Sequence, residues 1–352
     1  MYRRSLQLLL VFMAVHAASR TRAESWPRGQ VFVPAEVFSS RSRMDRVVLE
    51  SNPRLYLHPT FDPRSDLILV IGMPGWGGRS ENFIGCLYRG LTDDDLKRRL
   101  VLAAIQDPRT RGPRYQGQGE AQHANVWSLD GETIPALRHF IQRLADRLGS
   151  LRVYLFGFSS GSPSAPLAAV RVALMGPGRH FVVEGAVSLG TGSPVDAKKL
   201  AELGQRVLFL VAPKTRPREV KARRYDQAKR AHAEVAQARL ESNGAAAYLR
   251  HIESARRHLD WHWGLMSQCR YFREGRYDSG RGYWPNYWMP NPETFGYVAA
   301  FIRGMAPPER LAPPPTPCPH PPNPGNPTDP DAGVRDPGRQ TPWAPGTAPP
   351  GE

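Results

Sequence analysis

The sequence predicts an α/β fold with a mostly parallel central sheet and helices on both faces. The first observation is a set of short, continuous apolar runs such as LILVI at residues 67–71, which are typical of strands buried on both faces of a parallel sheet. The second is that segments with apolar residues at helical spacing lie between these runs. The two kinds of segment alternate, which indicates parallel strands joined by helices, with ligand-binding loops at the carboxyl ends of the strands.

The amino-terminal part of the domain is expected to contribute four strands. Residues 46–51 (RVVLES) and 55–60 (LYLHPT) are short and rich in strand-forming residues, and the Asn52-Pro53 pair between them predicts a hairpin turn. The apolar runs at 67–71 and 100–106 predict two buried strands.

The rest of the domain is expected to alternate helices with strands. Ile134, Leu137 and Ile141 recur at helical spacing, and Gly149 ends this helix at 130–149. Further strands are expected at 151–157, 181–190, 206–212 and 245–253, and further helices at 162–176, 220–244 and 292–305. Residues 262–290 show no clear period and are rich in Tyr, Trp, Gly and Arg, which favours a long loop or small cap over the site.

The amino terminus has the pattern of a secretory signal peptide, assigned to residues 1–23. Two arginines precede an apolar run of roughly 12 residues and then small residues, with cleavage expected near Ala18 or Ala23. The run is shorter than the about 20 residues that cross a bilayer easily, although an uncleaved anchor is the alternative. The sequence therefore predicts a secreted or periplasmic protein with no transmembrane span after signal removal, whose folded domain covers residues 25–305.

The carboxyl-terminal segment, residues 306–352, differs in composition from the domain. It holds 17 of the 35 prolines and almost no aliphatic residues. Proline donates no backbone N–H and cannot continue a helix, so this segment is predicted to be a disordered or polyproline-like tail. A chain ending near Met305 is accordingly expected to keep its stability.

The formal net charge of +15 comes from the domain, notably from residues 213–230. A basic face could meet an anionic envelope surface, although a solvated, arginine-rich helix is the simpler explanation. No nucleic-acid-binding motif is visible, and export argues against a nucleic acid partner. The three cysteines, Cys86, Cys269 and Cys318, do not have the spacing of metal ligands, and no metal site is predicted.

The sequence GFSSG at residues 157–161 is the strongest candidate for a catalytic motif. A G-x-S-x-G pattern has weight only where it follows a strand and opens a helix, and this one is predicted to do both. The glycines remove side chains that would collide in a tight turn, and the helix amino terminus places N–H groups and a positive dipole beside the serine. We therefore expect Ser159 to be a nucleophile and the N–H of Ser160 to serve an oxyanion hole.

Two further segments supply the other expected parts of an acyl-transfer site. GMPGWGG at residues 72–78 follows a buried strand, and the N–H of Trp76 is the expected second oxyanion donor. HLDWHWG at residues 258–264 follows the last strand and offers His262 as the general base, with His258 as the alternative.

These motifs resemble those of the α/β-hydrolase superfamily, and in particular secreted esterases of the polyhydroxybutyrate-depolymerase and feruloyl-esterase kind, over residues 55–305. The resemblance implies a Ser–His–acid triad that forms an acyl-enzyme and hydrolyses it with water. It also implies a small-molecule or polymer ester as substrate, with neither a metal nor an organic cofactor.

The sequence departs from this family at several positions. Pro74 stands where many members carry histidine, and Pro166 is expected to remove a hydrogen bond from the helix behind the nucleophile or to bend it. The family places its acid just after the strand at 206–212, where this chain has Thr215. Glu219 is the preferred acid, and Asp226 and Asp196 are the alternatives.

Two other functions and the state of two cysteines remain open from the sequence. The first is a peptidase or acyltransferase on the same fold, since a fold does not determine a substrate. The second is a binding protein that keeps the hydrolase fold but has lost the acid. The two cysteines are Cys86 and Cys269, which lie in segments that converge on the catalytic face of such a fold and are either joined by a disulfide or reduced and buried.

Overall fold

The computed structural model describes residues 26–39, 41–75, 80–107, 127, 129, 131–176, 178–211, 220–252 and 291–311. The chain divides into two units, residues 1–315 and 316–352, and everything described lies in the first. The predicted signal peptide, the aromatic segment at 262–290 and nearly all of the predicted tail lie outside the described residues. No helix among the described residues is both long and apolar enough to cross a membrane.

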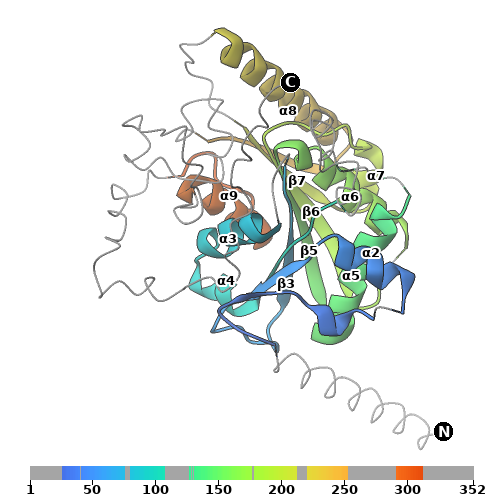
Figure 1. The fold of residues 1–352 in the computed structure, drawn as a ribbon. Helices are drawn as coiled ribbons and strands as arrows, with labels where there is room; N and C mark the ends of the chain where they lie inside the picture. The colour runs from blue at the N-terminus through green and yellow to red at the C-terminus, as the bar shows by residue number, and fades with distance from the viewer. Residues whose placement is uncertain are drawn as a thin grey trace, which may run out of the picture. The chain divides into compact units, whose positions relative to one another are not determined.

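An eight-stranded sheet runs through the domain in the order β1-β2-β4-β3-β5-β6-β7-β8 (Figure 1). Strands β3 to β8 are parallel to one another, and only β1 and β2 run antiparallel at one edge. The strands are β1 Val31–Phe32, β2 Arg54–Leu57, β3 Leu67–Met73, β4 Leu100–Ala104, β5 Leu151–Phe158, β6 Phe181–Leu189, β7 Arg206–Val211 and β8 Ala246–His251. This sheet confirms the predicted α/β class.

Helices cover both faces of the sheet (Figure 1). One face carries α2 Arg43–Glu50, α5 Thr133–Leu148, α6 Ser164–Leu174, α7 Ala197–Glu202 and α8 Val220–Ser242. The other face carries α3 Ser80–Gly90, α4 Asp94–Arg99 and α9 Pro292–Ile302. Two short 3-10 turns, η1 Ala35–Val37 and η5 Ser159–Gly161, complete the described elements.

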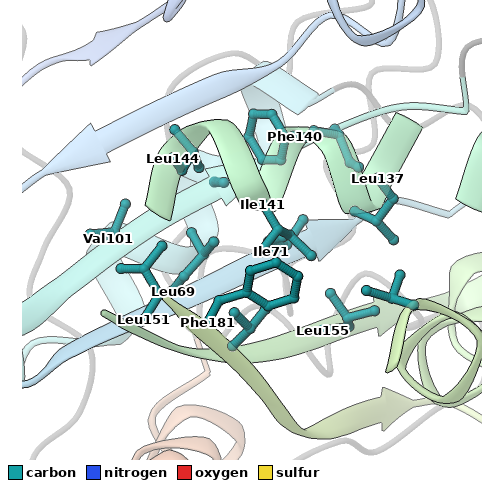
Figure 2. Close-up of a cluster of buried hydrophobic side chains, with 14 of the residues drawn as sticks. Leu69, Ile71, Val101, Leu137, Phe140, Ile141, Leu144, Leu151, Leu155 and Phe181 are labelled. Carbon is teal, nitrogen blue, oxygen red and sulfur yellow. The ribbon is translucent and has the colours of Figure 1, made fainter. Parts of the chain in front are cut away.

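Strand β3 shows why the apolar runs are continuous. All seven of its residues are buried. Leu69 and Ile71 point to the face that α5 covers, where Figure 2 shows them beneath Phe140 and Ile141. The intervening Ile68 and Val70 belong to the core beneath α3 and α9. Successive side chains of a strand point to opposite faces, so a strand covered on both faces needs an apolar residue at every position.

The prediction of a strand at residues 46–51 is wrong, because this segment belongs to helix α2 and its C-cap. The Ser42 hydroxyl caps the helix by accepting the N–H of Asp45. The Asp45 carboxylate is buried, accepts the N–H of Ser39 at 2.7 Å and lies 2.5 Å from Nε2 of His139 on α5. The capping residue and this contact with α5 override the strand preference of the Val-Val-Leu run, so there is no hairpin before β2.

Pro166 does not disturb helix α6, contrary to expectation. The helix begins at Ser164, with Pro163 at its N-cap, so Pro166 is the third helical residue. The first N–H groups of a helix have no partner within it, and a proline there removes no hydrogen bond. The helix begins two residues later than predicted, which places both prolines where they are tolerated.

Cys86 is a free, fully buried thiol on helix α3. It packs in the core beneath α3 and α9, and burial raises the pKa of this thiol to about 12. Of the two alternatives for this residue, the structure has the buried, reduced cysteine. Cys269 lies outside the described residues.

The domain continues past the predicted boundary at residue 305. Pro307 is buried, and its carbonyl and that of Pro308 accept hydrogen bonds from the guanidinium of Arg250 on β8. Leu311 packs against the core, and its N–H donates to the hydroxyl of Tyr297 at 3.3 Å. Residues 306–311 therefore form a strap that is part of the folded domain.

A chain ending at Met305 should therefore be less stable than one ending at Pro315. We expect the free energy of unfolding to fall by about 2 kcal/mol, from one partly buried leucine and the hydrogen bonds of Arg250. Urea titration of the two chains measures the difference, and Leu311→Ala in the full chain isolates the packing contribution. Equal unfolding midpoints would show that the strap adds no stability.

Candidate active site

The carboxyl ends of the parallel strands meet at one edge of the sheet. Met73 at the end of β3 pairs with Gly157 of β5, which pairs in turn with Ser188 near the end of β6. Val211 and His251, the last residues of β7 and β8, pair with each other at the same edge. The segments that follow these strands contain the predicted nucleophile, oxyanion loop, acid and base, so the topology brings the starts of all four to the same edge.

Ser159 lies at the turn between β5 and α6. Strand β5 ends at Phe158, the 3-10 turn Ser159–Gly161 follows, and α6 begins three residues later. Ser159 has a φ of 54°. A left-handed backbone is strained for a residue with a side chain, and such strain is held only where the surroundings fix it. The side chain is partly exposed at the edge of the sheet.

Both glycines of the GFSSG sequence are required by close backbone contacts. A Cβ on Gly157 would lie 2.1 Å from the carbonyl oxygen of Gly161, and a Cβ on Gly161 would lie 2.3 Å from the carbonyl oxygen of Met73. Neither space can hold a methyl group without moving the backbone. The two glycines thus permit the sharp turn that leaves the serine hydroxyl clear of the strand.

The loop after β3 runs directly against the serine. A Cβ on Gly75 would lie 2.6 Å from Cβ and 3.3 Å from Oγ of Ser159, and 2.8 Å from the carbonyl oxygen of Phe158. Only glycine allows this approach. The structure therefore brings together two of the predicted components, Ser159 and the glycine-rich loop at residues 72–78, as far as that loop is described.

A tryptophan from a distant part of the chain holds this loop. The indole N–H of Trp127 donates to the carbonyl oxygen of Pro74 at 3.3 Å, and the Trp127 side chain is buried. The C=O and the N–H of one peptide unit point in opposite directions. The bond to Trp127 therefore also sets the direction of the Gly75 N–H, at the point where the loop meets Ser159.

The remaining predicted site residues are described only in part. Ser160 lies in the 3-10 turn, and Asp226 lies in α8, in both cases with the side chain outside the description. The carboxylate of Asp196 is exposed and accepts the N–H of Lys199 as the N-cap of α7. Trp76, Glu219, His258 and His262 lie outside the described residues.

Sequence reasoning singled out Ser159 as a candidate and did not single out Trp127. The partners in the bond from Trp127 to Pro74 are 53 residues apart in the chain, and nothing near Trp127 resembles a motif. Gly75 lies within the predicted oxyanion loop at residues 72–78. Its contact with Ser159 could be found only in three dimensions. Within the described ranges, no group of three or more His, Cys, Asp or Glu side chains is placed to hold a metal ion.

Comparison with known proteins gives only distant similarities. No protein-family model matches the sequence, and no curated protein matches it. Among solved structures, a thermostable esterase is 15% identical with a TM-score of 0.36, and the match covers 56% of this chain but only 50% of the esterase. An esterase from Pyrobaculum calidifontis is 15% identical over 84% of this chain and 92% of its own, with a TM-score of 0.44. The naproxen esterase from Bacillus subtilis is 12% identical over 75% of this chain and 94% of its own, with a TM-score of 0.37.

Proposed function

We propose that this protein is a serine hydrolase that cleaves a carboxylic ester through an acyl-enzyme. The observation that carries the proposal is the conformation of Ser159. A serine with φ of 54° stands on a tight turn between a buried strand and a helix, and a glycine-rich loop is pressed against its side chain. Strain of this kind is concentrated at functional sites, and this turn matches the geometry that a nucleophilic serine needs.

In the proposed reaction, Oγ of Ser159 attacks the ester carbonyl while His262 takes its proton. The N–H groups of Trp76 and Ser160 bind the oxyanion that forms. The intermediate collapses, the alcohol leaves with the proton from His262, and the acyl group stays on Ser159. Water then gives a proton to His262 and attacks the acyl group, and the acid leaves as serine recovers its proton. Glu219 is the proposed partner of His262.

The strain at Ser159 also favours an enzyme over a binding protein built on the same fold. A protein that had lost catalysis would gain stability by placing glycine at this position, because glycine adopts a positive φ without strain. A peptidase or an acyltransferase would use the same nucleophile. These alternatives differ from an esterase only in the leaving group or in the molecule that accepts the acyl group.

A fluorophosphonate probe tests the nucleophile. The probe should bond to Ser159 in the native protein, and mass spectrometry of the labelled peptide should locate it there. Urea-unfolded protein is the control, because an unactivated serine does not react. A folded protein that is neither labelled nor active on esters would instead be a binding protein.

Substitutions test the remaining members of the triad. His262→Ala should abolish ester hydrolysis and His258→Ala should not. Among the acids, Glu219→Asn should lower kcat by about 10²-fold or more, since the imidazole loses its orientation. If Asp226→Asn has the larger effect, the acid lies in α8 instead. If Asp196→Asn has the largest effect, the acid is instead the carboxylate that caps α7.

Trp127 should support the oxyanion hole without contacting the substrate. Trp127→Phe removes the N–H that binds the Pro74 carbonyl and keeps an aromatic ring in the core. We expect kcat for a p-nitrophenyl ester to fall by about tenfold with little change in KM, because the lost contact affects the transition state more than substrate binding. A change in KM alone would show that Trp127 binds substrate.

We further propose that the protein is exported and acts as an esterase of the polyhydroxybutyrate-depolymerase and feruloyl-esterase kind. Its substrate is a small-molecule or polymer ester, and its basic face docks on an anionic envelope surface. The signal-like amino terminus and the formal charge of +15 support this. The amino-terminal sequence of protein recovered from the periplasm or medium would locate the cleavage. A panel of p-nitrophenyl esters, feruloyl esters and peptide amides would identify the acyl group and separate esterase from peptidase.

A further inference from the structure

A closed ring of three hydrogen bonds lies directly behind the nucleophile turn. The Ser188 hydroxyl donates to the carbonyl oxygen of Thr191 at 2.6 Å, and the N–H of Thr191 donates to the hydroxyl of Ser162 at 3.2 Å. The hydroxyls of Ser162 and Ser188 lie 2.8 Å apart. Ser188 has only one hydroxyl proton and uses it on Thr191, so the Ser162 hydroxyl donates to Ser188. Every donor in the ring therefore has one acceptor.

The two hydroxyls of the ring are out of reach of solvent. Ser162 and Ser188 are both 0% exposed. Bulk water cannot reach these hydroxyls, so a hydroxyl that loses its partner when the ring opens stays unsatisfied. The side chains are also too deeply buried to contact a substrate at the edge of the sheet.

The ring joins the nucleophile turn to the loop that follows β6. Ser162 comes directly after the 3-10 turn, and its N–H donates to the carbonyl of Ser159 at 3.1 Å. Its side chain belongs to the ring, so one residue links the backbone of the nucleophile to Ser188 and Thr191. The loop itself is held on its other side, where a Cβ on Gly192 would lie 2.3 Å from the carbonyl oxygen of His232 on α8.

We infer that the ring of Ser162, Ser188 and Thr191 is a positioning device that holds the nucleophile turn in its reactive conformation. The inference rests on the proposed function. The turn contains the strained Ser159 and the N–H of Ser160, and both must be placed accurately for attack and for oxyanion binding. A displacement of about 1 Å in such groups can cost on the order of 10²-fold in rate. Ser162 and Ser188 are positioning residues and do not take part in the chemistry.

Ser162→Ala and Ser188→Ala test the ring. Each variant should lower kcat for a p-nitrophenyl ester by about 10- to 100-fold with KM within about twofold, and should slow fluorophosphonate labelling by a similar factor. The loss of kcat in the double variant should equal the larger of the two single losses, because either substitution opens the same ring. Ser193→Ala is the matched control. Its hydroxyl donates to the Pro163 carbonyl at 2.7 Å, outside the ring, and its loss should leave kcat close to that of the parent.

The outcomes separate the ring from the proposed function. If the parent is labelled at Ser159 and the ring variants keep the parent's kcat while only their thermal midpoints fall, the ring is merely structural and the inference is overturned. Additive losses of kcat in the double variant would also contradict a single closed ring. A folded parent that is neither labelled nor active would overturn the proposed function, and the inference with it.

Discussion

Replacing Ser159 with alanine should abolish ester hydrolysis while leaving the fold intact. Loss of a triad nucleophile lowers the rate on the order of 10⁴-fold or more. Ser159 is partly exposed and adds little to the core, so the thermal midpoint should stay close to that of the parent. Active-site titration and calorimetry of the purified variant measure both effects. Activity close to the parent's would reject Ser159 as the nucleophile.

The variant Ser159→Gly should be as inactive as Ser159→Ala, but more stable. The φ of Ser159 is 54°, which is strained for alanine as it is for serine. Glycine removes this strain, and we expect Ser159→Gly to exceed Ser159→Ala by about 1 kcal/mol in the free energy of unfolding. Equal stability of the two variants would show that the turn is not strained.

The largest loss of stability is expected from Gly157→Ala. The new methyl group would lie 2.1 Å from the carbonyl oxygen of Gly161 and 2.9 Å from Cβ of Ala165. The backbone must move to admit it, and overpacking of this kind costs about 3 kcal/mol. Because the displaced backbone is the nucleophile turn, hydrolysis should fall with stability.

Gly85→Ala provides the matched control for this substitution. Gly85 lies within helix α3, and no atom stands within 4 Å of where its Cβ would be. Alanine is the better helix former, so this variant should be more stable than the parent by about 0.5–1 kcal/mol. Urea titration compares the two variants directly. A similar loss in both would contradict the assignment of the Gly157 effect to backbone crowding.

The parts of this fold that could be predicted are those that depend on local patterns. Strand β3 could be predicted because both of its faces are covered, which requires a continuous apolar run. The turn at Ser159 could be predicted because it needs glycines at fixed spacing. Helix α2 was mistaken for a strand because its Val-Val-Leu run outweighed the local cap at Ser42, and because the contact between Asp45 and His139, which joins it to α5, spans 94 residues of chain.

The candidate site likewise has parts that local patterns indicate and parts that depend on long-range contacts. Ser159 could be found from its neighbours in the chain, whereas the bond from Trp127 to Pro74 spans 53 residues and the bond between Ser162 and Ser188 spans 26. Tryptophan and serine have no pattern that marks them as supports of a distant loop. Their contacts form only when β3, β5 and β6 are side by side.

The buried thiol of Cys86 keeps the core around α3 out of thiol–disulfide chemistry. Burial raises the pKa of this thiol to about 12, so it is protonated at pH 7, and only the thiolate attacks a disulfide or an alkylating reagent. The core around α3 therefore does not depend on an oxidising compartment, and its stability should be the same with and without dithiothreitol.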